Sequence, residues 1–151
     1  MENQVAPKPM ILVIEPDPVF LTGISAVLDQ EGYRCFLSRD LTVANKALEK
    51  IVFDLIILSA PPDPLAAQQQ AIDLRTQPNA KDIPIVFLTS CWEESWRELL
   101  QSVGGVSCLS SPFDPHTLIK TVADAVWLPH LASAKVGPPK AHFLHDWVRL
   151  S

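Results

Sequence analysis

Short apolar runs alternate along the chain with longer segments in which apolar residues recur every three or four positions. A short apolar run bounded by turn-forming residues is typical of a parallel strand that is buried on both faces. The longer segments are typical of helices with one apolar face. The pattern predicts strands at residues 10–14, 33–38, 54–59, 83–89 and 106–109. It predicts helices at residues 18–31, 41–51, 64–76, 92–103 and 115–127.

Three of the predicted helices begin with an aspartate followed by a proline. The pairs are Asp17-Pro18, Asp63-Pro64 and Asp114-Pro115. The carboxylate can accept hydrogen bonds from the free N–H groups of the first turn, and proline suits the first helical position because it has no N–H to satisfy. The helix at 64–76 has a thin apolar stripe, because alanine and glutamine dominate its first half.

The regular alternation of strand and helix predicts the fold class. It is typical of a three-layer α/β domain, in which a doubly wound, parallel, five-stranded sheet carries helices on both faces and is joined by right-handed crossovers. We expect this domain to cover residues 10–127, after a disordered lead at 1–9.

The segment 128–151 differs in composition from the rest of the chain. Pro129, Pro138 and Pro139 interrupt it, so it is expected to form a linker or an extended arm,. Residues 141–150 fit one short amphipathic helix, whose apolar face would carry Phe143, Leu144, Trp147 and Val148,. Such an arm would dock on the domain or on a partner.

Composition and charge narrow the class of protein. The chain has 151 residues, of which 48% are hydrophobic and 19% charged, as expected for one compact domain,. Its net charge of −5 disfavours general attraction to nucleic acid or to an anionic membrane,.

The sequence shows neither a signal peptide nor an apolar run long enough to span a bilayer, since even the run at 51–58 contains Asp54,. A cytoplasmic location is expected.

Cysteine and histidine residues give no sign of a metal or disulfide framework. Cys35, Cys91 and Cys108 lack paired spacing and are expected to be buried structural thiols,. His116 has no partner at ligand spacing, and the spacing of His142 and His145 arises often by chance. We therefore expect no metal site and no cofactor.

The polar residue that ends the central apolar run is the first candidate for a functional site. In open α/β sheets, ligands bind beyond the carboxyl ends of the strands. Ser59 stands at this place after residues 54–58, and Thr89 and Ser90 end the next predicted strand. These hydroxyls would either line one site or simply terminate the strands.

Four blocks of sequence, in order and spacing, resemble the response-regulator receiver domain of two-component, phosphorelay signalling. They are residues 11–18, 53–59, 81–90 and 111–113, and the resemblance covers residues 10–127. It implies a flavodoxin-like (βα)5 fold. In that family an aspartate after the third strand takes a phosphoryl group from a phosphohistidine, and two acidic residues after the first strand help to hold Mg²⁺. A lysine after the fifth strand and a hydroxyl after the fourth meet the phosphoryl oxygens.

The resemblance maps these roles onto residues that mostly differ from the family's. The phosphoacceptor position is Ser59, the acidic pair is Glu15 and Pro16, and the lysine position is Ser111, whereas Thr89 keeps the hydroxyl. Pro112 keeps the proline that typically follows a cis bond in the family,. We expect a degenerate phosphorylation pocket formed by Glu15, Pro16, Asp17, Ser59, Thr89, Ser111 and Pro112.

The leading hypothesis is therefore a pseudo-receiver, not an enzyme, that binds a protein partner without phosphorylation. The partner would be a histidine kinase or an output protein.

One alternative is a conventional phosphoryl acceptor that uses the shifted carboxylates Asp17 or Asp63, although helix capping already explains both. Another is phosphorylation of Ser59 by a separate kinase. A third is a flavodoxin-like small-molecule binder, which is disfavoured because residues 15–18 lack a glycine-rich phosphate loop,.

Three tryptophans suggest an interaction face. Trp92, Trp96 and Trp127 fall on the predicted fourth and fifth helices, which form the usual output and dimer face of the family, so a homodimer through these helices is one expectation. Aromatic residues often anchor interfaces. However, the spacing of Trp92 and Trp96 beside Leu99 and Leu100 is more typical of a core.

Overall fold

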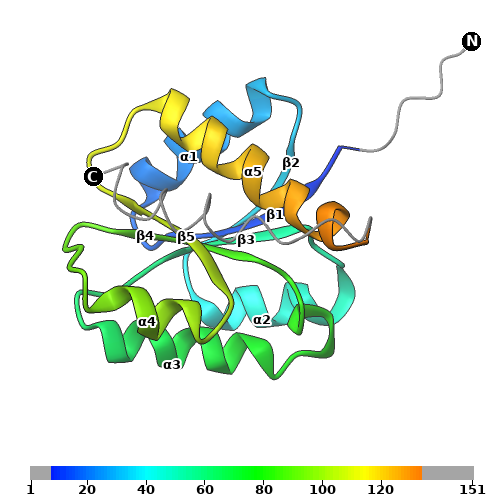
Figure 1. Ribbon diagram of the computed structural model, residues 1–151. Coiled ribbons are helices and arrows are strands. Elements are labelled where there is room, and N and C mark those ends of the chain that lie inside the picture. Colours follow the sequence, from blue (N-terminus) through cyan, green and yellow to red (C-terminus); the bar gives the residue numbers. More distant parts are fainter. Residues whose placement is uncertain (1–7, 134–151) are drawn as a thin grey trace, which may run out of the picture.

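The computed structural model describes the backbone of residues 8–133 and the side chains of residues 8–126. Its centre is a five-stranded, all-parallel sheet with the strand order β2-β1-β3-β4-β5 (Figure 1). The strands are β1 (Met10–Ile14), β2 (Arg34–Ser38), β3 (Leu55–Ser59), β4 (Ile85–Thr89) and β5 (Gly105–Ser110). The predicted parallel sheet is confirmed.

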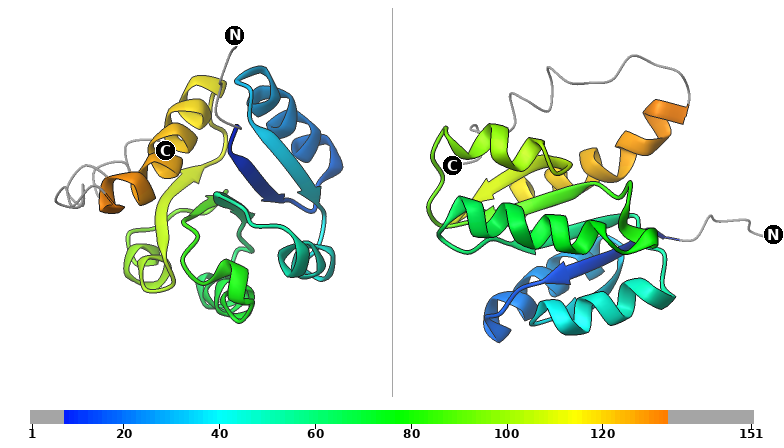
Figure 2. Two further views of the ribbon diagram at one scale, coloured as in Figure 1. Left: turned by 90° about the vertical axis from the view of Figure 1, so that its right-hand side faces the viewer. Right: turned by 90° about the horizontal axis from the view of Figure 1, so that it is seen from below.

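Helices cover both faces of the sheet, as Figure 2 shows. They are α1 (Pro18–Gln30), α2 (Leu41–Lys50), α3 (Pro64–Arg75), α4 (Trp96–Gln101) and α5 (Pro115–Ser133), with a short 3-10 helix η1 (Pro78–Ala80) before β4. Helices α1 and α5 lie on one face, and α2, α3 and α4 lie on the other (Figure 1). The predicted three-layer, flavodoxin-like α/β fold is therefore confirmed.

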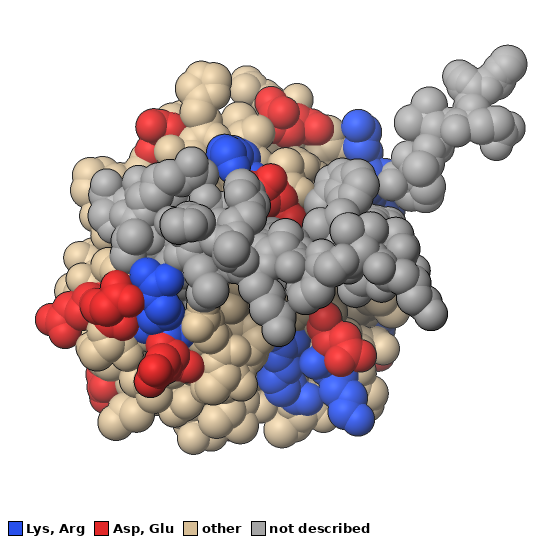
Figure 3. Space-filling view, in the orientation of Figure 1, with Lys and Arg blue, Asp and Glu red and all other residues tan. Residues whose placement is uncertain are grey.

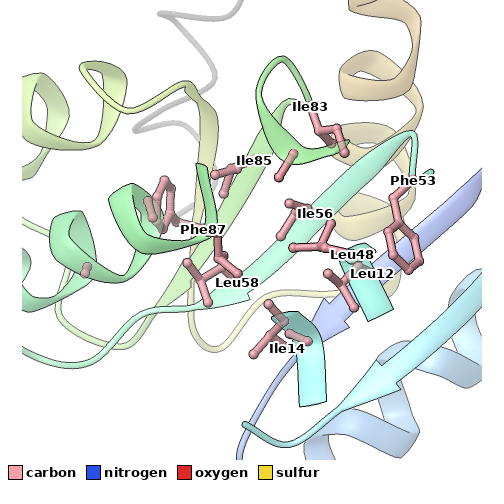
Figure 4. Close-up of a cluster of buried hydrophobic side chains, with 14 of the residues drawn as sticks. Leu12, Ile14, Leu48, Phe53, Ile56, Leu58, Ile83, Ile85 and Phe87 are labelled. Atoms are coloured by element: carbon pink, nitrogen blue, oxygen red, sulfur yellow. The ribbon is translucent and has the colours of Figure 1, made fainter. Parts of the chain in front are cut away.

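Alternate residues of the central strands build two separate cores. Leu12 of β1 and Ile56 and Leu58 of β3 point toward α2 and α3, where Phe87 of β4 joins them (Figure 4). Their neighbours along each strand, such as Val13 and Ile57, point toward α1 and α5. Apolar side chains on both faces explain why β3 is a continuous apolar run rather than an alternating one.

The aspartates before four helices act as caps. The Asp17 carboxylate accepts hydrogen bonds from the N–H groups of Val19 (2.9 Å) and Phe20 (3.4 Å), and Asp63 accepts from Leu65 N (3.0 Å). Asp114 accepts from Thr117 N (2.7 Å), and this bond lowers the pKa of its carboxyl group. Asp40 caps α2 in the same way through Val43 N (2.9 Å).

Two helix ends differ from the prediction. Helix α4 begins at Trp96 and not at Trp92, because residues 90–95 form a turn in which Cys91 N donates to Thr89 Oγ1 (3.0 Å) and Trp96 N to the Glu93 carbonyl (3.0 Å). Helix α5 continues to Ser133, beyond the boundary placed at residue 127. The predicted helix ended before Pro129, because a proline lacks the N–H that a helix interior uses. In the structure the helix continues through this proline.

The ends of the chain lie largely outside the described residues. This includes the lead at 1–7 and the segment 134–151, which contains the amphipathic helix predicted at 141–150. Lys8 and Pro9, assigned to a disordered lead, are held by Arg34: its N–H donates to the Pro9 carbonyl (3.0 Å) and its Nε to the Lys8 carbonyl (3.0 Å). Within the described residues, no helix is long and apolar enough to cross a membrane.

The three cysteines occupy different environments. Cys108 is buried, and burial raises the pKa of its thiol to about 12. Cys35 is half-buried, and burial together with the nearby Asp29 raises the pKa of its thiol to about 11. Cys91 is exposed in the turn before α4, so the expectation of three buried thiols is wrong for this residue.

The capping role of Asp17 predicts a specific effect on stability. Asp17→Ala removes an acceptor of two N–H groups and should lower the free energy of unfolding by about 1 kcal/mol in urea denaturation. Asp17→Asn, which keeps a capping oxygen but removes the charge, is the matched control and should change stability much less. Equal losses in both variants would show that charge, and not capping, is what the fold uses.

Candidate site at the carboxyl end of the sheet

The register of the sheet brings the predicted pocket residues to one edge. Ile14 pairs with Leu58, so Glu15 follows β1 beside Ser59 at the end of β3. Ser59 pairs with Leu88, which places Thr89 one residue further along on β4. Thr89 in turn pairs with Ser110, and Ser111 N donates to the Thr89 carbonyl at 2.7 Å. Four neighbouring strands thus end in the side chains singled out from the sequence.

Glu15 is a buried carboxylate with one free oxygen. The residue is 5% exposed, and its backbone N–H donates to the Ser38 carbonyl at 2.9 Å. Oε2 accepts a hydrogen bond from Asp17 N at 2.9 Å, whereas Oε1 is buried without a hydrogen-bond partner. The carboxylate therefore braces the turn between β1 and α1.

The other two residues of this turn serve local structure. The Asp17 carboxylate caps α1, as described above, which supports the capping interpretation over a shifted acidic pair. Pro16 is exposed and offers no side-chain oxygen, and its carbonyl accepts a hydrogen bond from Arg39 Nε at 3.1 Å. Glu15 is therefore the one carboxylate of this turn that does not cap a helix.

The hydroxyl residues at the strand ends differ in their surroundings. Thr89 is 4% exposed, and its Oγ1 accepts the hydrogen bond from Cys91 N. Ser59 and Ser111 are half-buried. The Ser111-Pro112 peptide bond is cis, as the family resemblance implies.

The donor groups at this edge do not fit the coordination of Mg²⁺. Mg²⁺ prefers an octahedral set of oxygens that includes one or two free carboxylates. Here Pro16 and Ser59 bring no charge and Asp17 is engaged in capping, so Oε1 of Glu15 is the one carboxylate oxygen of this set without a hydrogen-bond partner. Among the residues with described side chains, no three histidine, cysteine or acidic residues come together to hold a metal ion.

The predicted interaction face is only partly available at the surface. Trp96 is 2% exposed and belongs to the core beside Leu100 and Phe87, so it cannot anchor a partner. Its burial confirms the core interpretation. Trp92 lies in the turn before α4 and packs against the same core, partly exposed. The side chain of Trp127 lies outside those that the structure describes.

Sequence patterns did not reveal the role of Arg75. Its guanidinium donates to three backbone carbonyls, those of Ala80 (2.6 Å), Ile83 (2.5 Å) and Val103 (3.0 and 3.1 Å). Burial lowers the pKa of this guanidinium. A basic residue in the last turn of a helix was the available signal, but it indicates only a favourable interaction with the helix dipole.

Comparisons with known proteins agree with the fold. No protein-family model matches the chain. The chemotaxis protein CheY4 of Vibrio cholerae is 24% identical, with a TM-score of 0.71 over 78% of this chain and 98% of that chain. The receiver domain of the sensor histidine kinase PA1611 of Pseudomonas aeruginosa, solved with a magnesium ion coordinated in its active-site cleft, is 28% identical, with a TM-score of 0.64 over 79% and 98% of the two chains.

One curated relative also aligns with most of the chain. It is described as a probable transcriptional regulator of Porphyra purpurea and is 25% identical over 123 residues, which make up 82% of this chain. The chain spans 59% of the length of that relative. With the CheY-like structures as its neighbours and the resembling sequence blocks at the ends of its strands, the chain has the fold of response-regulator receiver domains and is similar to them.

Proposed function

We propose that this chain is a signalling domain that acts by binding a protein partner and does not accept a phosphoryl group on an aspartate. The observation that carries the proposal is Ser59 at the carboxyl end of β3, where the family resemblance places the acceptor. A neutral hydroxyl attacks a phosphohistidine poorly unless a neighbouring base removes its proton. The acidic residue that ends the neighbouring strand, Glu15, is already bound to Asp17 N.

The electrostatics of this edge oppose phosphoryl binding. Ser111 replaces the cation that would meet the phosphoryl oxygens, and hydrogen bonds from a charged donor are the stronger ones. The capping residues Asp17, Asp40, Asp63 and Asp114 follow β1, β2, β3 and β5, so they add negative charge at the same edge. A phosphoryl group brought here would meet like charge.

The small-molecule alternative finds no support in the geometry of α1. A phosphate-bearing ligand would use the free N–H groups at a helix start. Here Glu15 takes the Asp17 N–H and Asp17 takes those of Val19 and Phe20, while Pro16 and Pro18 have none. The amide donors of this turn are consumed internally.

Exposed aliphatic residues at the same edge support a protein partner. Val19, in the first turn of α1, is 80% exposed, and Leu65, in the first turn of α3, is 61% exposed. Both follow a capped proline at the edge that contains Ser59. On the parts of the face in Figure 3 that grey atoms do not cover, basic and acidic side chains are interspersed without a continuous basic stripe of the kind typical of a nucleic-acid interface,. The partner would be a histidine kinase or an output protein.

A homodimer through α4 and α5 also belongs to this proposal. Helix α4 has only six residues, and its tryptophan is buried. Helix α5 and the edge strand β5 would therefore supply most of such an interface. Sedimentation at several protein concentrations distinguishes a dimer from a monomer.

Incubation with acetyl phosphate and Mg²⁺ tests the central point of the proposal. The intact mass of the protein should not increase by one phosphoryl group, because the acceptor and the lysine are absent. A stable adduct localised to an aspartate would contradict the proposal, whichever aspartate carries it.

Restoring the missing groups provides the positive control. The triple variant Pro16→Asp, Ser59→Asp, Ser111→Lys places a carboxylate pair, an acceptor and a cation at the ends of β1, β3 and β5. It should gain an Mg²⁺-dependent adduct that is absent from the parent, because the backbone framework of the pocket is kept. The double variant without Ser59→Asp is the matched control and should remain unmodified. A triple variant that folds but stays unmodified would show that the framework itself has changed.

Partner binding should depend on the surface and not on the Ser59 hydroxyl. Once crosslinking has identified the partner, Ser59→Ala should bind it with unchanged affinity. The double variant Val19→Asp, Leu65→Asp should bind roughly tenfold more weakly or worse, because exposed apolar anchors would be replaced by charge. If Ser59→Ala abolishes binding while the surface variant binds normally, the hydroxyl and not the surface carries the signal.

A further inference from the structure

An open groove lies at the opposite edge of the sheet from the candidate site. We call it the β4–β5 groove and define it by Ile72, Ile83, Pro84, Val103 and Val106. Its volume is about 820 Å³. Pro84 directly precedes β4, and Val106 lies at the start of β5, so the groove is built on the amino ends of the two strands. Ile72 contributes a side chain that is 42% exposed.

The framework of the groove is fixed by Arg75. Its guanidinium bonds to the carbonyls of Ala80, Ile83 and Val103, and thereby ties the end of α3 to the segments before β4 and β5. Gly104, with φ of +87°, lets the chain pass directly over this guanidinium, where a Cβ atom would collide with Nη2. The charge of Arg75 is therefore directed at backbone carbonyls, which leaves apolar surface for an occupant.

The C-terminal segment leaves the domain at this same edge. Helix α5 runs antiparallel to the strands, so its last residue, Ser133, lies on the side where the strands begin (Figure 1). Val126, in the second half of α5, packs against the same core cluster as Val106 of the groove. Residues 134–151 then follow, with Phe143, Leu144, Trp147 and Val148 at helical spacing,.

The connection is long enough for these side chains to reach the groove. Residues 134–142 can span up to roughly 30 Å when extended. Helices α5 and α3 lie on opposite faces of the sheet, so the connection has to cross two layer spacings of about 10 Å each,. The rim of the groove has Lys81 and Asp82, and the segment offers Asp146 and Arg149 as counterparts of opposite charge. A tether of this length raises the local concentration to the millimolar range, so weak contacts suffice.

We propose that residues 141–150 dock in the β4–β5 groove of their own chain, with Phe143 and Trp147 covering Ile72 and Val103. Docking buries apolar surface that the domain otherwise exposes. It also places the end of the chain away from the candidate site, at the opposite edge of the sheet.

Limited trypsin digestion of the full chain tests the proposal. Cleavage after Lys140 and Arg149, followed by intact mass, should be slow in the parent protein and roughly fivefold faster or more in Ile72→Asp, because the cleavage rate follows the undocked population. Val52→Asp is the matched control: it places the same charge at the same edge of the sheet, before β3, at a residue that is also exposed but outside the groove. It should cleave at the parent rate. Equal rates in all three proteins would overturn the proposal.

Two further measurements assign the occupant. In amide hydrogen exchange, Phe143→Ala with Trp147→Ala should increase exchange at residues 101–106, whereas His142→Ala with His145→Ala, on the other side of the predicted helix, should not. Unchanged exchange at 101–106 in the first variant would overturn the proposal.

Protection from trypsin should be independent of protein concentration. Protection that rises with concentration would assign the groove to a second copy and would also overturn the intramolecular arrangement.

Discussion

The parallel register of β1, β3, β4 and β5 decides which ends of the strands, and hence which side chains, come together. The pairing of Ile14 with Leu58 and of Thr89 with Ser110 makes neighbouring strands end at one edge. The polar residues that follow must therefore lie near each other, whatever their chemistry. The same register leaves the amino ends of β4 and β5 together at the opposite edge, where Arg75 ties their backbones. One geometric fact thus creates both the candidate site and the groove.

The fold could be predicted because strands that are buried on both faces of the sheet appear in the sequence as continuous apolar runs. Residues 54–59 predict β3 almost to the residue, since every apolar side chain of Leu55–Ser59 is buried. Helix boundaries were less predictable, because they depend on local hydrogen bonds. Trp92 continues the apolar spacing of α4 but lies in a turn, which the Thr89 hydroxyl supports through Cys91 N. Phe20 matches the apolar face of α1 but remains 36% exposed, since its ring contacts Phe113 (5.7 Å between ring centroids) rather than the sheet.

The candidate site could be predicted only in part. Periodicity pointed to Ser59 as a strand end, but the grouping of Ser59 with Glu15, Thr89 and Ser111 came from the family resemblance. A hydrophobic pattern shows which residues are buried and not which polar residues converge. The hydrogen bond from Asp17 N to Glu15 Oε2 and the contacts of Arg75 with three carbonyls depend on tertiary geometry. Nothing in the local sequence specifies them.

The helix caps affect both the stability of the fold and the electrostatics on which the proposed function rests. An aspartate cap satisfies N–H groups that an anion could otherwise use, and it adds a negative charge at the end of the helix that would attract that anion. In a (βα)5 fold this end of every helix lies at the edge of the site, so each cap changes the potential there. A receiver that binds a phosphoryl group offsets this charge with Mg²⁺ and a lysine. Here uncharged Pro16 and Ser111 stand where the resemblance places that compensation, while the caps remain. The edge is thus well suited to holding helices in place and poorly suited to holding an anion, which is the physical basis for proposing that the partner binds the exposed surface.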